Sequence, residues 1–175
     1  SNYKTILDCG AGVFSEYFGF IKDNYDISYT ATEITNKFIK FGMRNGIKVD
    51  NFAINKLEYE DNIFDCVICY DVLNHQVDYK KGIEELIRVS KKELIISFFK
   101  PFKEDDNFQL SLGDAFPYYA SELGTIQKRD VNIFNQATLI YHYFSKRKLI
   151  DYLKTLNVSY QFDNMSGRNI LFIKK

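Results

Sequence analysis

The sequence has little of what several classes of protein require. Tryptophan is absent, and the 175 residues include only two prolines, two histidines and three cysteines. Basic and acidic residues number 23 each, so the formal net charge is zero. A balanced charge gives no bulk attraction to nucleic acid or to an anionic membrane. No apolar run approaches the roughly 18 to 20 residues that span a bilayer, and no signal peptide precedes the first strand. We therefore expect a cytoplasmic protein.

The three cysteines invite a metal or redox interpretation, which their pattern disfavours. Cys66 and Cys69 are spaced C-x-x-C, but both lie in the apolar run 64–70, which is typical of a buried strand. Side chains three positions apart on a strand point to opposite faces, so these two share neither a metal nor a disulfide. Cys9 lies in another apolar run. We expect all three to be small core residues and expect no metal site.

The most informative stretch lies close to the start of the chain. The apolar run 6–9 leads into Gly10-Ala11-Gly12, and apolar residues at helical spacing begin at Phe14. Gly10 and Gly12 adopt backbone angles closed to other residues, and without side chains they let a ligand lie against the main chain. The free N–H groups at the start of the next helix favour a polar or negatively charged group. This stretch therefore predicts a small-molecule site.

Strands and helices alternate along the first 100 residues. Further strands are predicted at 27–32, 47–54, 64–70 and 94–99, and helices at 35–45 and 79–91. Alternation at these lengths indicates a parallel sheet covered by helices on both faces. A helix capped by Ser145 and two short strands at 158–162 and 170–173 follow, and the short turn between these strands predicts an antiparallel pair.

Four blocks, in this order, resemble the motifs of one family. They are L-D-x-G-x-G around Asp8, F-D-x-V from Phe64, V-L-N-H-x-x-D from Val72 and E-L-x-R-V from Glu85. The chain is similar to class I S-adenosylmethionine-dependent methyltransferases of the group that acts mostly on small molecules. The resemblance implies a single α/β domain over 1–175, with a Rossmann-like, doubly wound, mostly parallel sheet and an antiparallel last strand. It also implies S-adenosyl-L-methionine as cofactor and an irregular substrate-side segment at about 100–144.

The resemblance also implies which residues hold the cofactor. Glu33 ends the second strand about 21 residues after Gly12, near the distance at which an acid accepts hydrogen bonds from ribose hydroxyls. An ordinary carboxylate at a helix start is the alternative. Asp8 would support the loop and the amino acid end of the cofactor, or be held by N–H groups of its own turn. The candidate cofactor-binding residues are Asp8, Gly10, Ala11, Gly12, Glu33, Ile34, Asn55, Leu57, Tyr70 and Asp71. Asp61 and Asn62 would lie near the adenine, while Phe14, Ile54 and Leu57 contact the cofactor or belong to the core.

Methyl transfer needs little from the protein beyond alignment of the acceptor. A base is required only where the nucleophile is poorly ionised, and Asp71 and His75 are the candidates for that role. We expect a small-molecule acceptor of apolar or aromatic character, because the segment 100–143 is rich in aromatic residues. Those expected to line the acceptor pocket are Phe102, Phe108, Phe116, Tyr118 and Tyr119. The sequence does not indicate an oligomeric state.

Three departures from the family pattern keep other functions open. Phe14 stands where the third glycine is usual, no acid follows the third strand cleanly, and the helices that usually precede the first strand are missing. A catalytically inactive methyltransferase fold that serves as a binding or regulatory protein is therefore an alternative. Gly10-x-Gly12-x-x-Ser15 also resembles the fingerprint of a nicotinamide-dependent oxidoreductase. Lys146-Arg147-Lys148 hints at a nucleic-acid methyltransferase, although the zero net charge favours a small acceptor.

Overall fold

The computed structural model describes residues 3–22, 26–76, 78–112 and 138–175. Its strands are β1 (Thr5–Cys9), β2 (Ser28–Thr32), β3 (Lys48–Asp50), β4 (Phe64–Tyr70), β5 (Ser90–Phe98), β6 (Asn107–Leu112), β7 (Thr138–Tyr143), β8 (Ser159–Met165) and β9 (Arg168–Lys174). Its helices are the π-helix η1 (Tyr17–Ile21), α1 (Asn36–Arg44), the 3-10 helix η2 (Leu73–His75), α2 (Tyr79–Val89) and α5 (Lys146–Thr155). None of these helices is long and apolar enough to cross a bilayer.

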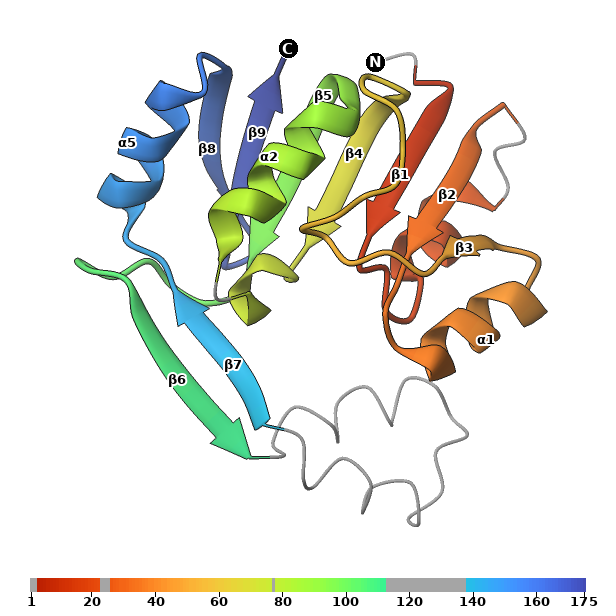
Figure 1. The fold of residues 1–175 in the computed structure, drawn as a ribbon, viewed down its shortest axis with the longest axis horizontal. Coiled ribbons are helices and arrows are strands. Elements are labelled where there is room, and N and C mark those ends of the chain that lie inside the picture. Colours follow the sequence, from red (N-terminus) through yellow and green to blue (C-terminus); the bar gives the residue numbers. More distant parts are fainter. Residues whose placement is uncertain (1–2, 23–25, 77, 113–137) are drawn as a thin grey trace.

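The main sheet has seven strands in the order β3-β2-β1-β4-β5-β9-β8, as Figure 1 shows. Strands β1 to β5 pair in parallel, whereas β9 is antiparallel to both β5 and β8. The predicted doubly wound α/β sheet with an antiparallel end is therefore confirmed. The chain leaves β1 in one direction to β2 and β3 and returns beside β1 at β4. Ligands of such sheets bind beyond the carboxyl ends of the strands at this reversal.

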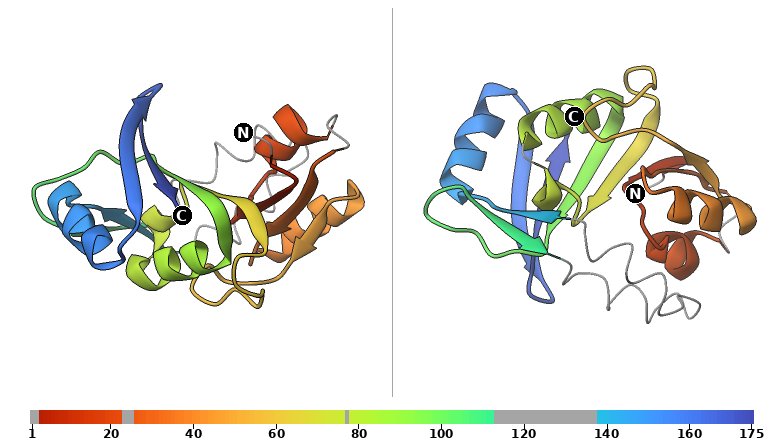
Figure 2. Two further views of the ribbon diagram at one scale, coloured as in Figure 1. Left: turned by 90° about the horizontal axis from the view of Figure 1, so that it is seen from above. Right: turned by 60° about the horizontal axis from the view of Figure 1, so that its bottom comes forward.

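Helices lie on both faces of the sheet (Figure 2). On one face, α2 and α5 pack on a core that includes Cys9, Val67 and Cys69. On the other face, η1 and α1 pack on a second core, which includes Cys66. The two cysteines of the C-x-x-C pair thus point to opposite faces, and all three thiols are buried and free. The prediction that they are core residues is confirmed.

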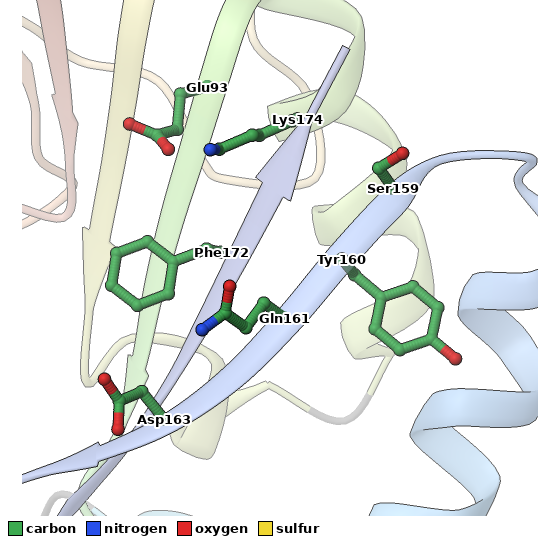
Figure 3. A pocket seen from close by; sticks show the side chains of 7 residues that line it. All are labelled: Glu93, Ser159, Tyr160, Gln161, Asp163, Phe172 and Lys174. Atoms are coloured by element: carbon green, nitrogen blue, oxygen red, sulfur yellow. The ribbon is translucent and has the colours of Figure 1, made fainter. Parts of the chain in front are cut away.

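The helices that the structure describes leave part of the second face open. Over β5, β9 and β8, a hollow is lined by Glu93, Ser159, Tyr160, Gln161, Asp163, Phe172 and Lys174 (Figure 3). Figure 3 shows the Tyr160 ring turned away from the others, toward α5, where it packs against the first core. This hollow lies on the face of the sheet and not at the glycine loop, so it is distinct from the predicted site.

Several element boundaries differ from those that the sequence predicts. The segment expected to be irregular contains β6, which pairs antiparallel with β7, so a hairpin is present there. The third strand is shorter than expected, and β5 begins at Ser90, directly after α2. Among the predicted acceptor-lining residues, Phe108 lies in β6, while Phe116, Tyr118 and Tyr119 lie outside the described residues.

Candidate functional site

The glycine loop after β1 is tied to the end of β2. The amides of Gly10 and Ala11 both donate to the carbonyl of Thr32, at 2.8 and 3.1 Å. Gly10 has φ +70°, and a Cβ there would lie 2.5 Å from Cγ2 of Val72, so only glycine fits. Gly12 has φ +53°, and its Cβ would meet nothing nearer than 4.0 Å. The main chain is therefore closely packed at Gly10 and open to a ligand at Gly12.

Glu33 joins this loop to the start of α1. Its buried carboxylate accepts the amide of Gly12 through Oε2 at 3.0 Å, and the amides of Ile34 and Thr35 through Oε1, each at 2.8 Å. Glu33 thus contacts the helix start, as one of the two predictions from the sequence has it, and it also contacts the glycine loop; its binding of a ribose stays a prediction. A carboxylate has about four lone-pair directions, so one remains for a further donor such as a hydroxyl group.

Asp8 lies directly under the loop, buried on β1. The hydroxyl of Tyr29, on β2, donates to its Oδ2 at 2.5 Å. Burial is the main reason that the pKa of Asp8 rises to about 7, although the Tyr29 hydrogen bond acts in the opposite direction. Asp8 is therefore held by a side chain of the neighbouring strand, while the N–H groups of the glycine turn donate to Thr32 and Glu33.

The segment after β4 approaches the loop from its other side. Tyr70 is half-buried, and burial raises the pKa of its hydroxyl to about 12. Asp71 has φ +64°, accepts the hydroxyl of Ser97 at 2.6 Å and forms an ion pair with Arg168 at 2.8 Å. Sequence patterns predicted Tyr70 and Asp71 but not Ser97 or Arg168. The described residues contain no group of three or more His, Cys, Asp or Glu side chains that could hold a metal.

Residues 7–98, just over half of the chain, match the family described as a methyltransferase domain. The chain belongs to this methyltransferase family. The predicted class I, Rossmann-like, S-adenosylmethionine-dependent methyltransferase fold is thereby confirmed, and S-adenosyl-L-methionine is the cofactor of such a domain.

Solved structures of low sequence identity share the fold. The 1,6-didemethyltoxoflavin-N1-methyltransferase of Burkholderia thailandensis, with bound 1,6-didemethyltoxoflavin and S-adenosylhomocysteine, has a TM-score of 0.66 at 14% identity, over 98% of this chain and 70% of that one. An S-adenosylmethionine-dependent methyltransferase from Mesorhizobium loti has a TM-score of 0.66 at 11% identity, over 98% and 90%. An uncharacterized protein of Methanocaldococcus jannaschii is 33% identical over 88 residues. The match covers 50% of this chain and only 36% of the length of that curated relative.

Phe14 occupies the place of the third glycine in this methyltransferase domain without entering the loop. Its φ is +61°, the left-handed conformation that glycine adopts readily. Its ring is fully buried and stacks on Phe41, with 6.2 Å between ring centroids. A Cβ on Gly42 of α1 would lie 2.6 Å from the tip of this ring. The ring is thus accommodated in the core because α1 has no side chain at Gly42.

The connector between β3 and β4 contains the predicted adenine-side residues. Leu57 is buried in the core, and its amide donates to Glu85 at 2.9 Å. Arg88 donates to the Leu57 carbonyl at 2.7 Å and forms an ion pair with Asp61 at 2.8 Å. The E-L-x-R-V block therefore fixes the shape of the connector. Asn55, Asp61 and Asn62 are exposed, so these members of the set face solvent.

The V-L-N-H block links the β6–β7 hairpin to the end of β5. The buried Asn74 donates to the carbonyl of His142 on β7 at 2.7 Å, and its Oδ1 accepts the amide of Phe99 at 3.2 Å. Burial lowers the pKa of His142, which favours the neutral imidazole at neutral pH. His75 lies beside the rings of Phe99 and Tyr141, each at 5.4 Å between centroids. Asn74 is thus an anchor, and His75 belongs to an aromatic cluster.

The raised pKa of Asp8 predicts a pH dependence of stability. Because the folded pKa of about 7 lies above the ordinary value of 3.8, the folded protein binds the extra proton between these values. Stability is therefore lost as pH rises through 7, and Asp8→Asn removes this loss. Between about pH 5 and pH 8, we expect the wild type to lose about 2 to 3 kcal/mol relative to the variant, measured by urea unfolding. Parallel pH curves for the two proteins would contradict the prediction.

Proposed function

We propose that this domain binds S-adenosyl-L-methionine between the glycine loop and the end of β2, and that it moves the methyl group to a small-molecule acceptor by in-line displacement. One observation carries the proposal: the buried Glu33 carboxylate accepts the amide of Gly12 at 3.0 Å. It brings an acid and an open stretch of main chain together at the carboxyl edge where the strand order reverses. That is the place and chemistry expected for a nucleoside.

The residues around this point suit the parts of such a cofactor. Glu33 has acceptor capacity left for a ribose hydroxyl, and the exposed side chain of Ile34 offers an apolar surface to the adenine. The open space at Gly12 leaves room beside the main chain. Asp8 and Tyr70 lie toward the amino acid end. The exposed Asn55 is assigned to the adenine side, whereas the buried Leu57 supports the connector from the core.

S-adenosyl-L-methionine, when bound, supplies a methyl group on a sulfonium that is already electrophilic. The protein residues then have to orient the acceptor and keep water away from it. Three rings meet beyond β4 and β5: His75, Phe99 and Tyr141, with Phe99 and Tyr141 5.8 Å apart. The ammonium of Lys100 lies 4.4 Å from the centre of the Tyr141 ring. This aromatic cluster supports an apolar or aromatic acceptor.

Of the two candidates for a catalytic base, His75 fits the acceptor side better. It belongs to the aromatic cluster, and an imidazole titrates near neutral pH. Asp71 is already engaged by Ser97 and Arg168, which gives it a positioning role. A base is needed only for an acceptor whose nucleophile is poorly ionised.

The alternative functions have less support. The Phe14 ring lies in the core rather than in the loop, which answers one of the three arguments for an inactive scaffold. The basic run at the start of α5 is engaged within the protein, since Lys148 pairs with Asp105 at 3.1 Å and Lys146 lies over the Phe162 ring. This disfavours a nucleic-acid acceptor. A single domain over 1–175 and a cytoplasmic location remain part of the same proposal.

Isothermal titration calorimetry with S-adenosylhomocysteine tests the proposal. We expect saturable binding of one molecule, and no heat with reduced nicotinamide adenine dinucleotide under the same conditions. An inactive scaffold without a cofactor site predicts no heat with either ligand. Tight binding of the reduced nicotinamide alone would instead support an oxidoreductase and overturn the assignment.

A further inference from the structure

An ion pair links the last hairpin of the chain to the loop after β4. Arg168 is the first residue of β9, which begins at the carboxyl edge because β9 runs antiparallel to β5. Its Nη1 lies 2.8 Å from Oδ2 of Asp71. The next residue after Asp71 is Val72, whose side chain packs against Gly10. The guanidinium therefore lies close to the glycine loop, although 160 residues separate Arg168 from Asp8 in the chain.

The position of this guanidinium is fixed by several contacts. Ser97 on β5 donates its hydroxyl to Oδ1 of Asp71 at 2.6 Å, and the Asp71 amide donates back to the Ser97 hydroxyl at 3.1 Å. These bonds hold Asp71 at φ +64°, a backbone conformation that is unfavourable for a residue with a side chain. The side chain of Arg168 remains 53% exposed. A guanidinium has five N–H donors, so the contact with Asp71 leaves donors for a ligand.

The charges of this ion pair also act on Glu16, which lies just after the glycine loop and is partly buried. Burial is the largest influence on the pKa of Glu16 and raises it, while the charge of Arg168 lowers it and the charge of Asp71 raises it. Glu16 also raises the pKa of Tyr70 and of Asp8. Its carboxyl group is thus electrostatically coupled to the ion pair and to the residues beneath the loop.

We propose that Arg168 binds the carboxylate at the amino acid end of S-adenosyl-L-methionine, with Asp71 and Ser97 as positioning residues. An amino acid is a zwitterion, so its recognition needs a cation and an anion side by side. Arg168 presents a planar fork suited to a carboxylate, and Asp71, 2.8 Å from Arg168, is the anion beside it. The assignment rests on the proposed function, and it gives the terminal hairpin a part in cofactor binding.

Two ligands that differ at the amino acid end test this inference. S-adenosylhomocysteine carries the amino acid, whereas 5′-methylthioadenosine has the same nucleoside and sulfur without it. In calorimetric titrations, Arg168→Gln is expected to weaken S-adenosylhomocysteine about 10- to 100-fold, as for loss of a charge-assisted hydrogen bond. Binding of 5′-methylthioadenosine should change less than about twofold. Arg168→Lys keeps the charge but not the fork, and we expect an intermediate loss.

Arg147→Gln is the matched control, because Arg147 is exposed in the first turn of α5 and both ligands should bind this variant as they bind the wild type. Unchanged binding of S-adenosylhomocysteine to Arg168→Gln would overturn the inference. Arg168 would then be a candidate to bind an anionic acceptor instead of the cofactor. Equal weakening of both ligands would also overturn it, since the effect would not depend on the carboxylate. If the wild type bound neither ligand, the proposed function itself would fail.

Discussion

Replacing Glu33 by alanine is expected to weaken binding of S-adenosylhomocysteine by about a hundredfold, with ten times weaker as the smallest effect compatible with the proposed site. The change removes the acceptor of three backbone amides, those of Gly12, Ile34 and Thr35. It also removes the proposed partner of the ribose hydroxyls. A hydrogen bond to a charged group contributes about 1.5 to 3 kcal/mol, so loss of the one to the ligand corresponds to about 10- to 100-fold in affinity. The loop loses its support as well. Titration calorimetry measures the effect.

Two further variants make the Glu33 test specific. Glu33→Gln keeps one acceptor oxygen but places an NH2 group against backbone amides, so we expect it to weaken binding nearly as much while causing a smaller structural disturbance. Glu58→Ala is the matched control, because Glu58 is exposed and forms an ion pair with Lys56 at 3.3 Å. Wild-type affinity in Glu33→Ala, with an unchanged melting temperature, would show that the nucleoside lies elsewhere.

Replacing Phe14 is expected to have the largest effect on stability. Phe14→Ala removes a fully buried ring and should lower the free energy of unfolding by about 3 to 5 kcal/mol. Phe14→Gly leaves the same cavity but relieves the unfavourable φ of +61°. Glycine usually destabilises by about 0.5 to 1 kcal/mol relative to alanine. Here we expect the reverse order, with the glycine variant at least as stable as the alanine variant in urea unfolding.

The expected order of the two variants depends on the backbone at residue 14. Ile39 on α1 is a control position, because it is also buried but lies inside a regular helix. There, Ile39→Gly should be less stable than Ile39→Ala by the usual margin. If Phe14→Gly were also less stable than Phe14→Ala, the left-handed backbone at residue 14 would carry no strain, which would contradict the prediction.

The fold and the glycine loop were predictable because their signals are local. The apolar runs and the two glycines mark β1, β4 and the turn between β1 and η1. The spacing from Gly12 to Glu33 reflects one strand–helix–strand unit, whose length varies little. The N-F-Q-L-S-L pattern of β6 alternates as an edge strand should, and this signal could have identified the hairpin with β7.

Other features of the site depend on partners far away in the chain. The direction of the Phe14 ring depends on the absence of a side chain at Gly42. No sequence motif near Phe14 indicates this contact. Arg168 follows an ordinary Ser-Gly turn, and only the antiparallel return of β9 brings it to Asp71. Leu57 was counted with the cofactor residues because of its place in the family pattern, whereas the structure places it in the core.

The reversed last strand also determines where the chain can be attached to something else. Because β9 runs back from the carboxyl edge, the end of β9 and the start of β1 both lie at the edge of the sheet opposite the glycine loop (Figure 1). Lys175 is held there by the carbonyls of Ile87 and Ser90, at 2.9 Å each. A surface, a label or a second protein joined at either end would approach the molecule from the side away from the glycine loop. Both ends are therefore suitable points for immobilisation in the binding experiments described above.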